Sequence, residues 1–146
     1  LTPLSVSADR IGSAAMRCAI RLAELARRGQ PVDRAGTGKV AEVYPAASLK
    51  VWGLTHQGDK RPREPEKLGQ LMDELATQTP WPKQGEIAGQ CRRQHDAADA
   101  LIAALAARAA SRGLTLRPRN PAEEAAARTE GWVAIPRNGT TLSQLP

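Results

Sequence analysis

The sequence predicts an α/β protein in which helices predominate and one or two strands of a mixed sheet complete the fold. Apolar residues recur at helical spacing along most of the chain, whereas only two short segments alternate as strands do. Aromatic residues make up 3% of the chain and Phe is absent, so the core must be built largely from Ala and Leu. A chain of 146 residues is long enough for one such domain with a single core.

Five segments are predicted as helices. The first, residues 11–28, has apolar side chains at helical spacing and closes with Arg27, Arg28 and Gly29. Basic residues in the last turn followed by Gly are typical of a helix C-terminus. The other helices are expected at residues 46–52, 67–76, 94–112 and 122–128.

Two segments are predicted as strands. In residues 39–45 the alternation places Glu42 on one face and Val43 on the other. Residues 132–135, with the sequence WVAI, are expected to form a terminal strand. The chain after Pro136 is expected to be a frayed tail.

The charge balance favours a polyanionic partner. Lys and Arg number 21 against 15 Asp and Glu, and most of the cations are Arg, whose planar guanidinium suits phosphate. A basic composition with no bearing on function is the alternative. Cys18 and Cys91 lack the spacing of metal ligands, and no apolar run reaches the length of a membrane span, so a cytoplasmic protein without a membrane partner is expected.

The predicted helix at residues 94–112 contains the strongest candidate for a site. From Asp96 to the end of its Ala-rich stretch, the ionisable residues are Asp96, Asp99 and Arg108, so we expect this helix to be packed on several sides. Carboxylates at i and i+3 lie on one helix face, beside His95, and can share a divalent cation. The alternative is that both acids stabilise the first turn, where backbone N–H groups lack partners.

Four segments together resemble one family. They are SVSADRIG at residues 5–12, EVYPAASLKVWGL at 42–54, HDAADALIAAL at 95–105 and EGWVAIP at 130–136. In this order they resemble the family called domain of unknown function 429, which is described as predicted nucleases of RNase H-like fold. The helix with the two aspartates also resembles the last catalytic helix of RuvC-type resolvases.

The resemblance implies a mixed sheet flanked by helices, with acids from two strands and a final helix gathering Mg²⁺ or Mn²⁺. Two such ions would promote phosphodiester hydrolysis. Asp96 and Asp99 match the acids of the final helix, with Asp99 as the direct ligand and Asp96 and His95 assisting.

The family's opening hairpin with a Gly-x-Asp strand, and its later Asp-Ala-Pro strand, have no counterpart in this sequence. Residues 1–136 are therefore expected to be the C-terminal part of one RNase H-like domain, truncated at its N-terminus, with residues 137–146 as a flexible tail. Glu42 is a candidate to replace a missing catalytic carboxylate. The alternative is that Glu42 hydrogen-bonds a helix N-terminus or an Arg.

Nucleic-acid phosphates are the expected partners of Arg10, Lys60, Arg61 and Arg63, although solvated surface is the alternative for each. The sequence therefore predicts a metal-dependent nuclease. The alternative is an inactive nucleic-acid-binding or structural module of the same fold. Neither the choice between DNA and RNA nor the oligomeric state follows from the sequence.

Overall fold

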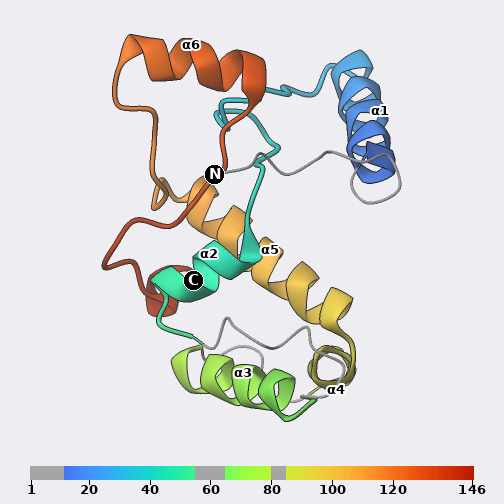
Figure 1. Ribbon diagram of the computed structural model, residues 1–146, viewed down its shortest axis with the longest axis vertical. Coiled ribbons are helices and arrows are strands. Elements are labelled where there is room, and N and C mark those ends of the chain that lie inside the picture. The colour runs from blue at the N-terminus through green and yellow to red at the C-terminus, as the bar shows by residue number, and fades with distance from the viewer. Residues whose placement is uncertain (1–11, 55–64, 80–84) are drawn as a thin grey trace, which may run out of the picture.

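The structure is a computed structural model that describes residues 12–54, 65–79 and 85–146, and helices dominate it (Figure 1). In chain order they are α1 (Ser13–Arg27), α2 (Pro45–Val51), α3 (Pro65–Gln78), α4 (Glu86–Arg93), α5 (His95–Ser111), α6 (Pro121–Glu130) and the short 3-10 helix η2 (Leu142–Gln144). No described helix is long and apolar enough to cross a membrane.

The predicted α/β class, with the mixed sheet of an RNase H-like fold, is wrong for the described residues, which contain no strand. Two isolated bridges take its place, Glu42 with Val133 in parallel and Thr115 with Pro136 in antiparallel orientation. The two predicted strands do lie side by side, since the Ala134 N–H donates to the Glu42 carbonyl at 2.7 Å. Prolines end both segments, because Pro45 begins α2 and Pro136 has no N–H to donate.

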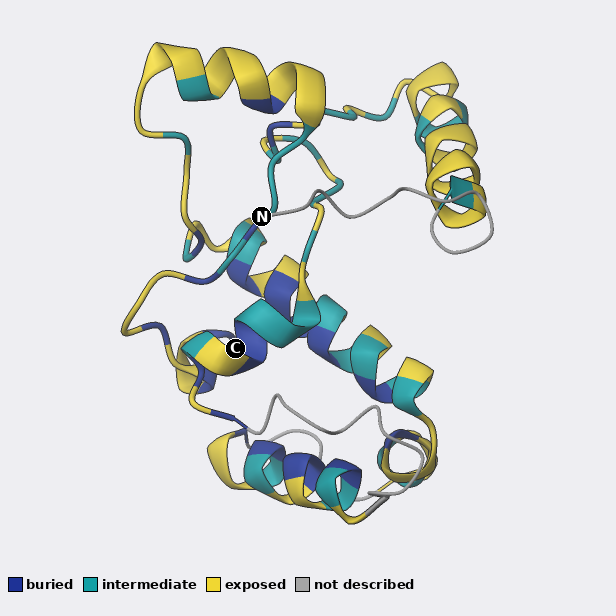
Figure 2. Cartoon of the chain, viewed as in Figure 1, coloured by how far each residue is buried: buried dark blue, intermediate teal, exposed yellow. Residues whose placement is uncertain are grey.

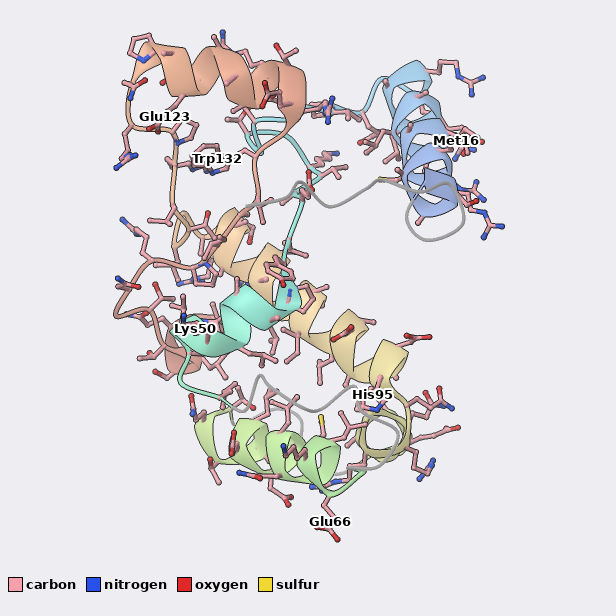
Figure 3. All side chains as sticks on the ribbon, in the orientation of Figure 1. Met16, Lys50, Glu66, His95, Glu123 and Trp132 are labelled. Atoms are coloured by element: carbon pink, nitrogen blue, oxygen red, sulfur yellow. The ribbon has the colours of Figure 1, made fainter. Side chains whose placement is uncertain are left out.

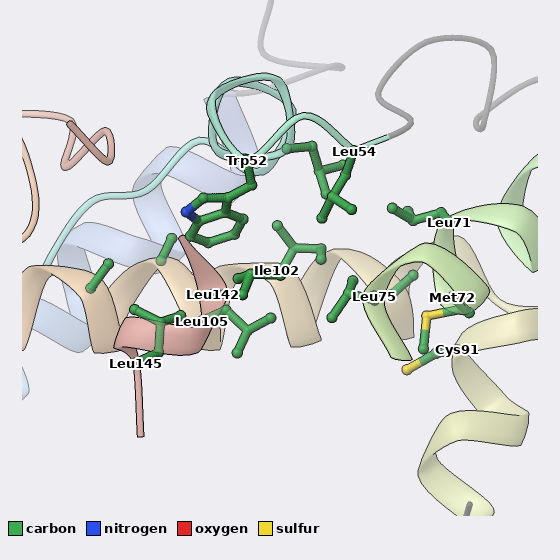
Figure 4. Close-up of a cluster of buried hydrophobic side chains, with 14 of the residues drawn as sticks. Trp52, Leu54, Leu71, Met72, Leu75, Cys91, Ile102, Leu105, Leu142 and Leu145 are labelled. Carbon is green, nitrogen blue, oxygen red and sulfur yellow. The ribbon is translucent and has the colours of Figure 1, made fainter. Parts of the chain in front are cut away.

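The core lies around α5, which α2 crosses and α4 adjoins (Figure 1). The buried residues of α5 share one face of the helix and are Ala98, Ile102, Leu105, Ala106 and Ala109. Side chains from α2, α3, α4 and the C-terminal segment pack with Ile102 and Leu105 in a single apolar cluster (Figure 4). Ala100, Ala104 and Ala107 are exposed, so α5 is packed along one face rather than on several sides as expected.

The ends of α1 and α5 follow local sequence signals. Gly29 and Gly113 lie just beyond these helices with φ angles of 70° and 69°, a backbone conformation that favours Gly. At the start of α6, Asn120 accepts a hydrogen bond from the Glu123 N–H at 2.9 Å. These signals explain why the predicted and observed ends of the helices agree closely.

The last ten residues, predicted to form a flexible tail, are anchored to the core. Leu142 and Leu145 are buried in the main cluster. Arg108 Nε of α5 donates to the Leu145 carbonyl at 3.0 Å. Two leucines three residues apart give this segment enough apolar surface to dock on the core. Because most of its other residues are polar, the sequence did not indicate this docking.

Helix α1 differs from the other described helices because it has no buried residue (Figure 2). It lies to one side of the helices that surround α5 (Figure 1). Next to it in the chain, Arg34 donates to the carbonyls of Thr129 and Glu130, at 2.7 Å each, and so links the segment after α1 to the C-terminus of α6.

Candidate metal site

The candidate site lies at the corner between α4 and α5. Helix α4 ends at Arg93, and one extended residue, Gln94, separates it from α5. The Gln94 carbonyl accepts the Ala98 N–H at 3.1 Å and so begins the new helix. The chain therefore turns sharply just before His95 and Asp96.

Asp96 and Asp99 lie on the same face of the first turns of α5. At this spacing the two Cβ atoms of a helix are about 5 to 6 Å apart. Asp96 is exposed and Asp99 is half-buried. The pair thus presents its carboxylates near the surface, at the end of α5 that adjoins α4.

His95 begins α5 and stands at the same corner (Figure 3). The residue is half-buried, and its Nδ1 atom is buried with no hydrogen-bond partner among the described residues. Buried polar atoms are normally hydrogen-bonded, so this nitrogen is unusual.

Glu42 lies elsewhere in the fold. A Cβ atom on Gly131 would lie 3.1 Å from Glu42 Oε2 and 3.4 Å from an Arg34 guanidinium nitrogen. Glu42 therefore neighbours the C-terminus of α6, while the aspartates lie beside α4 (Figure 1). Across residues 12–54, 65–79 and 85–146 no three His, Cys, Asp or Glu side chains come close enough to hold a metal ion.

The cations predicted to contact nucleic acid fall outside the described residues. They are Arg10, Lys60, Arg61 and Arg63. Their role in binding stays a prediction.

The electrostatics next to the site are set by α4. Arg92 forms an ion pair with Asp73 of α3, and this hydrogen bond holds the pKa of Asp73 below its ordinary value. The same pair raises the pKa of Arg92. Burial raises the pKa of the Cys91 thiol, so this cysteine packs in the core as a neutral group.

One cationic surface was not singled out from the sequence. Four arginines, Arg17, Arg21, Arg27 and Arg28, belong to α1 or directly follow it, and all are exposed. Their spacing in the sequence was the available signal, but the sequence did not show that this helix would be exposed.

The described chain is thus a small helical protein with a carboxylate pair at the start of its central helix. Residues 2–124 match the family described as "Protein of unknown function (DUF429)", and the chain belongs to this family. The match confirms the resemblance seen in the sequence, and the family's description states no activity. No curated protein and no solved structure matches the chain.

Proposed function

We propose that this protein takes part in metal-dependent hydrolysis of nucleic-acid phosphodiester bonds, with Asp96 and Asp99 as ligands of Mg²⁺ or Mn²⁺. The observation that carries the proposal is the placement of these two carboxylates on one face of the start of α5. Mg²⁺ is commonly bound by one or two protein carboxylates, with water and substrate phosphate completing its shell, so the pair fits part of such a site. A bound cation would stabilise charge on the phosphate during hydrolysis.

Helix capping is the competing explanation for the two aspartates. The structure shows no hydrogen bond from a described residue to Asp96, and the N-cap residue Gln94 makes no side-chain cap. Attraction to the helix dipole remains, and it contributes about 0.3 to 1 kcal/mol for an exposed carboxylate. Capping by a hydrogen bond therefore does not account for Asp96, which favours a role toward a ligand.

His95 supports the proposal as a positioning residue. Its side chain lies at the corner from which both aspartates project, and its buried Nδ1 lacks a described partner. In the proposed site it would orient the neighbouring carboxylates rather than act on the phosphate.

A second candidate function is nucleic-acid binding without hydrolysis. It is favoured by the finding that the described residues bring no third ligand to the aspartate pair. The net charge of +6 suits a phosphate backbone in either case. The two functions differ in whether the pair binds a cation, which is directly measurable.

A titration with Mn²⁺ followed by NMR tests the proposal. We expect the ion to broaden the signals of His95, Asp96 and Asp99 at substoichiometric concentrations. The variant Asp96→Asn with Asp99→Asn should lose this broadening. It should also lose Mn²⁺-dependent cleavage of labelled single-stranded and duplex DNA and RNA.

The chain contains a comparison site, a second helix that begins with two acids. Glu123 and Glu124 begin α6, and Glu123 is paired with Arg119 at 2.9 Å. Broadening at this pair equal to that at Asp96 and Asp99 would show only general attraction of cations to acidic helix starts, and would overturn the proposal. Selective Mn²⁺ binding without cleavage would favour the second candidate.

A further inference from the structure

Helix α1 concentrates positive charge on a surface that the fold does not use. Residues 13–28 contain four arginines and one acid, Glu24, which gives a net charge of +3. None of the residues of α1 is buried.

Three of these arginines form a stripe. With 3.6 residues per turn, Arg17, Arg21 and Arg28 fall within an arc of about 40° around the helix axis. At 1.5 Å per residue they span about 16 Å along the axis, with Arg17 and Arg21 about 6 Å apart. Phosphates follow one another at about 3.4 Å along the axis of each strand of duplex DNA, so the stripe is long enough to contact several of them.

The arginines of α1 have little to do within the fold. Arg17, Arg27 and Arg28 make no side-chain hydrogen bond or ion pair with any described residue, and Arg21 is paired with Glu24 of the same helix at 2.9 Å. By contrast, Arg34, Arg92 and Arg108 each bind a carbonyl or carboxylate of a distant segment. The stripe is therefore available for a partner outside the chain.

The side of α1 next to the stripe is apolar. Met16 and Ile20 are 60% and 57% exposed. Met16 is labelled on α1 in Figure 3. A second copy of the chain is the alternative occupant of this helix. Pairing two copies through α1 would bring together two segments 13–28, each of net charge +3, whereas a polyanion complements that charge.

We propose that α1 is a nucleic-acid-binding helix, in which Arg17, Arg21 and Arg28 contact consecutive stretches of the phosphate backbone. This inference rests on the proposed function for its substrate class. It adds a binding surface separate from the aspartate pair. By binding nucleic acid, α1 would help to supply the pair with substrate.

The test is the salt dependence of binding of the full chain to a fluorescein-labelled 20-nucleotide single strand, measured by anisotropy in EDTA. The test variant is Arg17→Gln/Arg21→Gln/Arg28→Gln. The charge-matched control is Lys50→Gln/Arg112→Gln/Arg128→Gln, which alters exposed cations on α2, at the end of α5 and on α6. Gln is a good helix former, and all six substituted side chains are exposed, so both variants should fold.

We expect the α1 variant to bind at least tenfold more weakly near physiological salt, and the slope of log K against log salt to fall by about 2. The control should keep the parental slope. Equal losses in the two variants would show that net charge alone drives binding and would overturn the inference. Unchanged binding by the α1 variant would also overturn the inference. If, in addition, the parent is a dimer that Met16→Ser/Ile20→Ser converts to a monomer, a second copy of the chain occupies α1 instead.

This experiment distinguishes failure of the proposed metal-dependent function from failure of the inference about α1. Binding is measured without metal, so the Asp96→Asn/Asp99→Asn variant should bind the strand as the parent does. If Mn²⁺ does not broaden the signals of His95, Asp96 and Asp99 in the parent protein, the proposed function alone is removed. Unchanged binding by the α1 variant would remove the inference alone.

Discussion

Helices α1 and α5 are similar in length, 15 and 17 residues, and both are rich in Ala, yet they have opposite positions in the structure. Helix α5 buries five residues and organises the core, whereas α1 buries none. Both sequences consist mainly of strong helix formers, so local propensity is sufficient to form either helix. The comparison shows that helical spacing predicts a helix but not the surface on which it packs.

The difference between the two helices lies in what their apolar side chains contact. Ile102 of α5 is 1% exposed and lies in the main cluster, while Ile20 of α1 is 57% exposed. The same residue type therefore occurs in two environments within one chain. This gives a direct way to measure how much each helix contributes to stability.

The largest expected effect comes from shortening these two isoleucines. Ile102→Ala should lower the free energy of unfolding by about 2 to 5 kcal/mol, because it removes buried methylene groups and leaves a cavity. Ile20→Ala should change it by less than about 0.5 kcal/mol, as is usual for exposed positions. Urea denaturation followed by circular dichroism measures both. A large loss for Ile20→Ala would mean that α1 is covered in solution, by a second copy or another part of the protein.

A smaller effect is expected for an arginine on each helix. Arg108 of α5 donates to the Leu145 carbonyl, so Arg108→Ala should destabilise the protein by about 1 kcal/mol through loss of a part-buried hydrogen bond. It should also speed hydrogen exchange of the Leu145 amide, which donates to the Leu142 carbonyl. Arg17→Ala on α1 should leave both measurements unchanged. If Arg108→Ala does not speed hydrogen exchange at Leu145, the docking of η2 does not depend on this hydrogen bond.

The helices were more predictable than the way they pack. The sequence placed the ends of α1, α2 and α5 within two residues, because Arg and Gly at helix ends and Pro at a helix start are local signals. Helix α4 was missed because EIAGQCRR is only eight residues long and buries only Cys91, so its apolar pattern is too short to stand out. The strands were wrong because alternation at Glu42 and Val133 creates a sheet only where further strands extend the pairing, and that depends on distant segments.

In the candidate site, too, the local arrangement was predictable from the sequence and the long-range arrangement was not. Asp96 and Asp99 share a face because their spacing within one helix fixes it. The approach of Glu42 to that pair depended on the path of the whole chain, and the structure places Glu42 beside Gly131 instead. The cationic stripe of α1 was visible in the sequence, but its exposure was not, because exposure depends on what the rest of the fold covers.

The smallest expected effect concerns two exposed ion pairs, one between helices of the core region and one within α1. Arg92 of α4 holds the pKa of Asp73 in α3 below its ordinary value through a hydrogen bond, whereas Arg21 and Glu24 pair within α1. A lowered pKa means that the pair's stabilisation is present above the unfolded-state pKa of about 3.9 and is lost as pH falls through the folded-state pKa. Arg92→Gln should therefore return the pKa of Asp73 toward its ordinary value, as measured by NMR titration of its carboxyl carbon. The difference in stability between this variant and the parent should shrink below about pH 4.

Arg21→Gln is the matched control. It should leave the titration of Asp73 unchanged, because it alters a pair on a helix that contributes no residue to the core cluster. An unchanged pKa of Asp73 in Arg92→Gln would show that the Arg92–Asp73 pair does not hold in solution.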